Sequence, residues 1–178
     1  METTQLSPPL PRARTGRWLG RMSNRLGAFG MTAVFGLGAI GGLVQNCNPP
    51  PSPQQQVVNI TNQRRAEAGL APVSVDSRLM NAAQAHSVDQ ARRGRMTHTG
   101  SDGSNGGTRI TRAGYTWSKW GENVAAGYSN ATSVMKGWMG SSSHRANILN
   151  RSMKHIGVGL AYSSNGTTYW TMVVAAPG

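Results

Sequence analysis

The sequence predicts an α+β domain in which helices pack on a small antiparallel sheet. Apolar residues recur at helical spacing between residues 76 and 93. The chain then ends in two segments with strand composition, 155–162 and 167–175, and the pair Asn165-Gly166 between them favours a tight hairpin turn. Helices that precede a hairpin in a chain of 178 residues fit one domain with additional segments.

The first 46 residues divide into a basic segment, 1–25, and an apolar segment, 26–46. The first contains five arginines, and residues 26–44 within the second contain no charge. A basic segment before an apolar run is typical of an export signal, and this run also approaches the length of a membrane-spanning helix. The alternatives are a cleaved signal peptide and an anchor through residues 26–44. Either one predicts an extracellular or cell-surface protein.

Residues 47–56 are interpreted as a linker because prolines and glutamines dominate them and cannot bury a core. The single cysteine, Cys47, excludes an internal disulfide and a cysteine zinc site. Lipidation of Cys47 would be another tether, but Asn46 precedes it, where lipoprotein signals have a small residue. A free thiol is the preferred interpretation, and the folded domain is placed at 57–178.

Two helices are expected at the start of this domain. The first covers residues 54–68, and Gly69 is a natural stop. Asp76 can cap the second helix, which extends to Arg93 and ends at Gly94. These helices supply the first apolar surfaces that the sheet can cover.

Shorter elements are expected between the second helix and the hairpin. Residues 97–107 form a loop rich in Gly, Ser and Asn, and 108–113 form a helical turn. A helix follows over 131–139, where apolar residues return at helical spacing. Ser143 can cap a last short helix over 144–149.

The chain is strongly basic, with a net charge of +12. After residue 46 there are ten Arg and three Lys against three Asp and two Glu. Such a surface favours anionic partners, so we expect an anionic cell-envelope component or lipid, with solubility alone as the alternative. We expect no nucleic acid partner, because the arginines are not interleaved with aromatic residues and no nucleic-acid-binding motif occurs.

Three polar residues, His98, Glu122 and His144, are candidates for a shared site. His98 enters the glycine-rich loop, and His144 lies in the first turn of a predicted helix, whose dipole disfavours imidazolium. Glu122 precedes an apolar stretch, where a carboxylate needs a partner such as histidine. Their spacing matches no known motif, so the residues alone also allow three separate roles. We interpret His86 and His155 as structural histidines.

The motifs around these residues resemble the CAP superfamily of cysteine-rich secretory, antigen 5 and pathogenesis-related proteins. The resemblance rests on Gly-Glu-Asn at 121–123, Ser-His-Arg-Ala-Asn-Ile-Leu at 143–149 and Ile-Gly-Val-Gly at 156–159, and it covers about residues 57–176. It is closest to the bacterial, disulfide-free branch. It implies an α-β-α sandwich and one cleft that is lined by His98, Glu122 and His144.

In one respect the chain departs from that family. Animal CAP proteins usually have a second glutamate just after the helix tryptophan, whereas Ser141 occupies this place after Trp138. A mechanism with paired carboxylates is therefore not expected. On the rim of the implied cleft we expect Ser141, Asp102 and Asn123.

The three site residues suit metal binding. Two neutral imidazoles, those of His98 and His144, can hold Zn²⁺ or another divalent cation. In a metal-assisted hydrolase all three would be catalytic, with Glu122 as the base. The first expectation is a secreted or cell-surface protein whose cleft binds a metal and an extracellular ligand. The alternatives are a hydrolase, a lipid- or sterol-binding protein, and a structural component of an envelope assembly.

Overall fold

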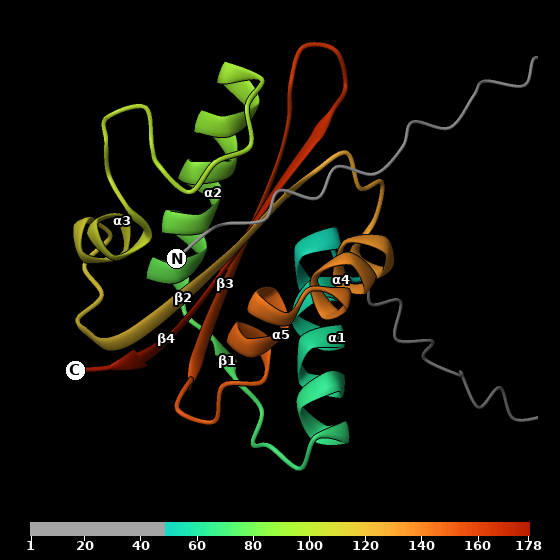
Figure 1. The fold of residues 1–178 in the computed structure, drawn as a ribbon, viewed down its shortest axis with the longest axis vertical. Coiled ribbons are helices and arrows are strands. Elements are labelled where there is room, and N and C mark those ends of the chain that lie inside the picture. The colour runs from blue at the N-terminus through green and yellow to red at the C-terminus, as the bar shows by residue number, and fades with distance from the viewer. Residues whose placement is uncertain (1–48) are drawn as a thin grey trace, which may run out of the picture. The chain divides into compact units, whose positions relative to one another are not determined.

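A four-stranded sheet lies between two layers of helices in the computed structural model, which describes residues 49–178 (Figure 1). Helices α2 and α3 pack on one face, and α1, α4 and α5 pack on the other. This arrangement confirms the predicted α-β-α sandwich. The elements are α1 Pro53–Glu67, β1 Ser74–Val75, α2 Ser77–Arg93, α3 Gly106–Arg112, β2 Trp117–Ala126, α4 Ala131–Gly140, α5 Ser142–Ile148, β3 His155–Tyr162 and β4 Thr168–Pro177.

The sheet is mixed rather than purely antiparallel. Its strand order is β1-β3-β4-β2, in which β3 and β2 flank β4 antiparallel while β1 runs parallel to β3. The sequence did not predict β1, because two exposed residues carry no alternating pattern, nor β2, whose first half is largely exposed. The predicted hairpin of β3 and β4 is confirmed.

Alternate side chains of β4 supply two separate cores. Trp170, Met172 and Val174 pack with the layer of α1, α4 and α5, whereas Val173 and Ala175 pack with α2 and α3. This alternation follows from the two-residue period of a strand. Because both faces of the strand are covered, its sequence from Met172 to Ala176 is continuously apolar.

Helix α2 packs directly against the backbone of β3. A Cβ atom at Gly157 would overlap the backbone of Leu79, and one at Gly159 would overlap that of Ala83. Glycine is therefore required at both strand positions. This close approach holds the first half of α2 against the sheet.

The helix ends agree with the sequence in most places. Asp76 accepts a hydrogen bond from Arg78 N, and Gly94 ends α2 in the left-handed region at φ 60°. Helix α1 begins at Pro53, so the last four residues assigned to the linker belong to it. The predicted cap of α5 was wrong: the N-cap is Ser141, and it makes no side-chain capping bond.

Several predictions lie outside the described residues. These are the basic segment 1–25, the apolar segment 26–46 and the thiol of Cys47. Within residues 49–178, none of the helices has the length and apolar character needed to cross a membrane.

Candidate functional site

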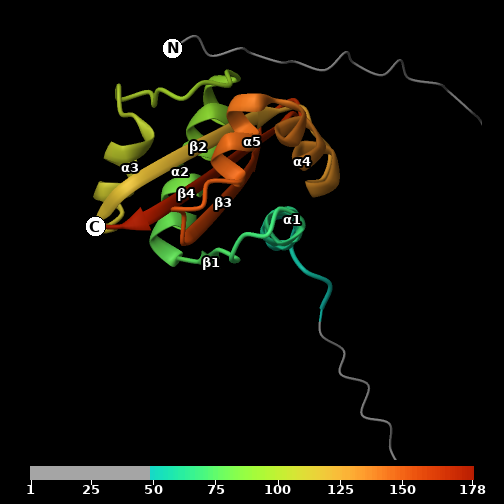
Figure 2. The ribbon, with the colours of Figure 1, turned by 60° about the horizontal axis from the view of Figure 1, so that its bottom comes forward.

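Strand β2 lies at the edge of the sheet and is the element around which the candidate site is built. Among the described strands it pairs only with β4, so no strand occupies its other edge, and other segments can pack there (Figure 2). The loop after α2 brings His98 to this edge, and α5 brings His144. We call His98, Glu122 and His144 the edge site.

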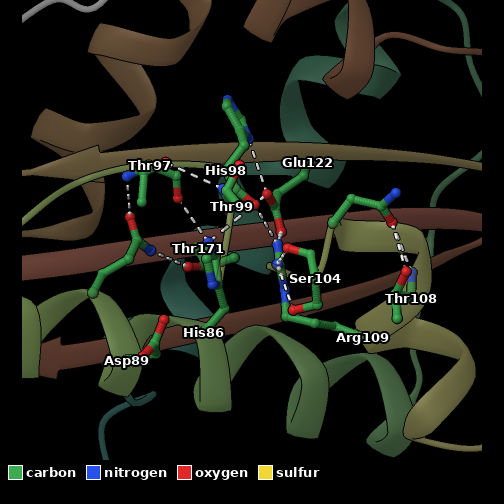
Figure 3. Close-up of polar contacts among 12 residues, drawn as sticks. His86, Asp89, Thr97, His98, Thr99, Ser104, Thr108, Arg109, Glu122 and Thr171 are labelled. Carbon is green, nitrogen blue, oxygen red and sulfur yellow. Dashed lines mark hydrogen bonds and ion pairs between the residues drawn. The ribbon is translucent and has the colours of Figure 1, made fainter. Parts of the chain in front are cut away.

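Glu122 is the buried centre of the edge site, with a side chain only 2% exposed. Its Oε1 accepts a hydrogen bond from His98 Nδ1 at 2.9 Å, and its Oε2 accepts one from Arg109 Nη2 at 2.6 Å (Figure 3). Burial alone would raise the pKa of Glu122, but the His98 hydrogen bond and the Arg109 charge outweigh it and hold the pKa below its ordinary value. The carboxylate is therefore ionised, and each of its oxygens accepts a hydrogen bond.

Arg109 is a site residue that the sequence analysis missed. Besides Glu122 it binds the backbone oxygen of Ser104 at 2.8 Å and that of His98 at 3.0 Å. One guanidinium thus ties α3, the glycine-rich loop and β2 together. The signal in the sequence was indirect: a lone buried carboxylate requires a cation, and arginine holds a permanent charge that histidine does not.

His86 supports the same network from α2. Its Nε2 lies 2.8 Å from the backbone oxygen of Thr97, so Nε2 carries the hydrogen, and it lies 4.0 Å from Glu122 Oε1. Burial lowers the pKa of His86 despite the carboxylate beside it. Its Nδ1 is buried without a hydrogen-bond partner in the described part of the chain. The prediction of a hydrogen-bonded core histidine is confirmed.

His144 is held by two asparagines behind it. Asn123 Nδ2 donates to the backbone oxygen of His144 at 3.1 Å, and Asn147 Nδ2 donates to Asn123 Oδ1 at 2.8 Å and to the backbone oxygen of Glu122 at 3.2 Å. A Cβ at Gly121 would lie 2.5 Å from Asn147 Oδ1, so the glycine makes room for this contact. The two asparagines join α5 to β2 and fix the place of His144.

The histidines of the edge site present free ring nitrogens. Because Glu122 binds Nδ1 of His98, Nε2 is left on the opposite side of a ring that is 40% exposed. The ring of His144 is half-buried and has no hydrogen bond within residues 49–178. Burial, and next the electrostatic interaction with the nearby His98, lower the pKa of His144, which favours the neutral imidazole.

This donor set suits a weak metal site rather than a closed one. Neutral imidazole nitrogens are common ligands of divalent transition metals, and a carboxylate behind one of them orients the ring. Two protein donors leave other positions to water or to a ligand. Nowhere in residues 49–178 do three His, Cys, Asp or Glu side chains form a metal-binding group.

The three residues predicted for the rim of the cleft lie in three different surroundings. Asn123 is fully buried and supports His144 from behind, so its assignment to a rim was wrong. Asp102 is exposed and pairs with Arg112 rather than with a residue of the edge site. Ser141 lies at the start of α5, where its hydroxyl contacts that of Ser143.

Comparison with known proteins assigns most of the described residues to one family. The model of the cysteine-rich secretory protein family, CAP, matches residues 58–174. Among curated proteins, YkwD of Bacillus subtilis (strain 168) is 35% identical over 118 residues, which are 66% of this chain and 45% of YkwD. The chain thus spans less than half the length of this relative.

Solved structures show the same fold. An extracellular protein from Bacillus anthracis that contains an SCP domain superposes with a TM-score of 0.63 at 24% identity, over 72% of this chain and 45% of that protein. An outer surface protein from Borrelia burgdorferi superposes with a TM-score of 0.65 at 18% identity, over 70% of this chain and 92% of that protein. These relatives are bacterial, and the two solved structures are extracellular or surface proteins.

Proposed function

This chain belongs to the cysteine-rich secretory protein (CAP) family, and we propose that it is an extracellular or cell-surface protein whose edge site binds a divalent metal ion. His98 and His144 would be the ligands. The observation that carries this proposal is the 2.9 Å hydrogen bond between Glu122 Oε1 and His98 Nδ1, which leaves Nε2 available. A carboxylate behind a ligating histidine is a recurrent feature of metal sites.

Binding is favoured over hydrolysis by the state of Glu122. A general base must reach the proton that it removes, whereas both oxygens of Glu122 are occupied by His98 and Arg109. The depressed pKa further weakens the carboxylate as a base. A bound ion would act as a Lewis acid towards an oxygen ligand, and the chain's own contribution is to hold two imidazoles in place.

Export is supported by separate observations. The basic segment 1–25 and the apolar segment 26–46 have the order of an export signal. The solved relatives named above come from outside the cell or from its surface. The excess of positive charge after residue 46 would hold the protein near an anionic envelope component or lipid.

A Zn²⁺ titration of the full chain, followed by NMR of ¹⁵N-labelled histidines, tests the metal site. We expect the signals of His98 and His144 to shift together while those of His86 and His155 stay unchanged. Glu122→Gln should weaken Zn²⁺ binding by about 10–100-fold, because the ring of His98 loses its orienting anion.

Asp102→Asn is the matched control for that substitution, because it also removes one carboxylate charge but from outside the edge site. It should leave the Zn²⁺ affinity within about twofold. An equal response of all four histidines, or no response, would contradict the proposed metal site.

A further inference from the structure

A pocket lies between α3 and the first half of β2, and the proposed metal ligands do not line it. It has a volume of about 360 Å³, within the ~300–1,000 Å³ of small-molecule sites. Two tryptophans from β2 form one wall, and side chains of α3 and its N-cap form the other. We call it the tryptophan groove, lined by Asn105, Gly107, Thr108, Thr111, Arg112, Trp117 and Trp120.

The two indole rings are fixed in position. Their centroids lie 6.2 Å apart in an edge-to-face arrangement, and Trp117 Nε1 donates to Thr111 Oγ1 at 3.0 Å. A Cβ at Gly106 would lie 2.5 Å from Trp120 Cζ3, and one at Gly107 would lie 2.7 Å from Trp120 Nε1. The paired glycines therefore let Trp120 lie against the backbone of α3. Rigid rings lose little entropy when a ligand packs on them.

The polar lining of the groove consists mainly of unused hydrogen-bond donors. Asn105 Oδ1 accepts bonds from Thr108, which leaves the Asn105 amide hydrogens without a partner among the described residues. The Thr111 hydroxyl accepts from Trp117 and keeps its own hydrogen free. Arg112 is 60% exposed and binds Asp102 through Nη1 alone, so its other nitrogens face no partner within residues 49–178.

From this lining we infer that the tryptophan groove binds a segment of an acidic polysaccharide. A pyranose ring has an apolar C–H face that packs on an indole and a rim of oxygens that accept hydrogen bonds, which matches both walls. Arg112 supplies a charged fork for a carboxylate on the sugar. The inference goes beyond the metal site and does not depend on it, since none of the groove residues belongs to the edge site.

The groove lies beside the edge site. Trp120 precedes Glu122 by two residues on the same face of β2, a separation of about 7 Å along a strand. The groove and the edge site are therefore neighbours along one strand. A lipid tail would leave the donors of Asn105 and Thr111 buried and unpaired, which costs free energy.

Titration of the full chain with tetragalacturonate, an acidic oligosaccharide, and with tetra-N-acetylglucosamine, a neutral one, tests this inference. Both titrations contain a chelator, so that failure of the metal site has no effect on them. We expect tetragalacturonate to bind more tightly and to shift the NMR signals of the Trp117 and Trp120 indole N–H groups. Trp117→Ala should weaken binding about tenfold, and Trp117→Phe should restore part of it.

Arg112→Gln should lower the affinity for tetragalacturonate about fivefold or more and leave the neutral sugar nearly unaffected. Arg92→Gln is the matched control, because it removes the same charge from an exposed position on α2. Tyr162→Ala removes an exposed aromatic side chain from β3 and controls for Trp117→Ala. Both controls should change the affinity less than twofold.

Three outcomes would overturn the inference. The first is the absence of binding by either oligosaccharide at millimolar concentration. The second is an equal loss with Arg92→Gln and Arg112→Gln, which would indicate charge attraction without a site. The third is reversal of the sugar-induced shifts of the indole signals by a competitor, either the peptide NPPPSPQQQ (residues 48–56) or phosphatidylglycerol vesicles. That result would assign the groove to a proline-rich or a lipid ligand.

Discussion

Arg65 and Glu122 are buried charged side chains on opposite faces of the sheet, and their partners differ in kind. Arg65, on α1, is 1% exposed. Its guanidinium donates only to backbone oxygens, which belong to Ala71, Ile148, Asn150 and Met153. These bonds join α1 to the segment that follows it, to the end of α5 and to the segment that links α5 to β3.

The two partners of Glu122 differ in exposure. Arg109 compensates its charge within the interior, whereas the ring of His98, which binds the other oxygen, is 40% exposed. A buried charge with only backbone partners stabilises a fold. A buried charge that orients an exposed imidazole also prepares a nitrogen for binding. The comparison separates a buried ion bound by backbone oxygens from a buried ion that orients a partly exposed histidine.

Removal of Arg65 should have the largest effect on stability. Arg65→Met leaves buried backbone oxygens without donors, and we expect the free energy of unfolding to fall by about 3–5 kcal/mol in urea denaturation. Arg64→Met, at the exposed neighbour that pairs with Glu67, should cost less than about 1 kcal/mol. Zn²⁺ affinity should be unchanged in whatever Arg65→Met protein remains folded. A loss of Zn²⁺ affinity in the folded Arg65→Met protein would contradict the distinction between the surroundings of Arg65 and those of Glu122.

A smaller loss of stability is expected from Glu122→Gln. The amide keeps the shape and one acceptor but removes the anion that faces Arg109 and His98, so we expect a loss of about 2–3 kcal/mol. Glu67→Gln, which breaks an exposed pair, should leave the free energy of unfolding nearly unchanged. Equal changes in the free energy of unfolding from these two substitutions would show that the burial of Glu122 does not affect stability.

The pH dependence of stability should be weaker still and should come from two histidines, His86 and His144. The pKa values of His86 and His144 are lowered in the folded state, while unfolded histidine titrates near ~6.5. The unfolded chain therefore binds more protons just below that pH, and the free energy of unfolding should fall as the pH drops from about 7 to 5.

Urea denaturation across this pH range, with a chelator present, measures that dependence. His86→Gln should flatten it, because the buried neutral imidazole is gone, whereas Arg65→Met should leave the slope intact. A stability that rises as the pH drops from about 7 to 5 would contradict the lowered histidine pKa values.

Local patterns were sufficient for several parts of the fold. The caps of α2 at Asp76 and Gly94 and the hairpin at Asn165-Gly166 were predicted because their signals lie within a few neighbouring residues. Strand β2 was missed because it is an edge strand with an exposed first half, and Arg109 because its partner Glu122 is thirteen residues away. In the candidate site, His98, Glu122 and His144 came from family resemblance, since their spacing matches no motif.

The sequence by itself determined most of the elements, the caps of α2, the basic charge and the identity of the three site residues. Only the tertiary structure decided what each of these residues can do. Glu122 is an orienting anion rather than a free base because Arg109 and His98 occupy its oxygens, and Asn123 is a buried support rather than a rim residue. The physical reason is that hydrogen bonding and burial depend on contacts between segments far apart in the chain, which local periodicity cannot specify.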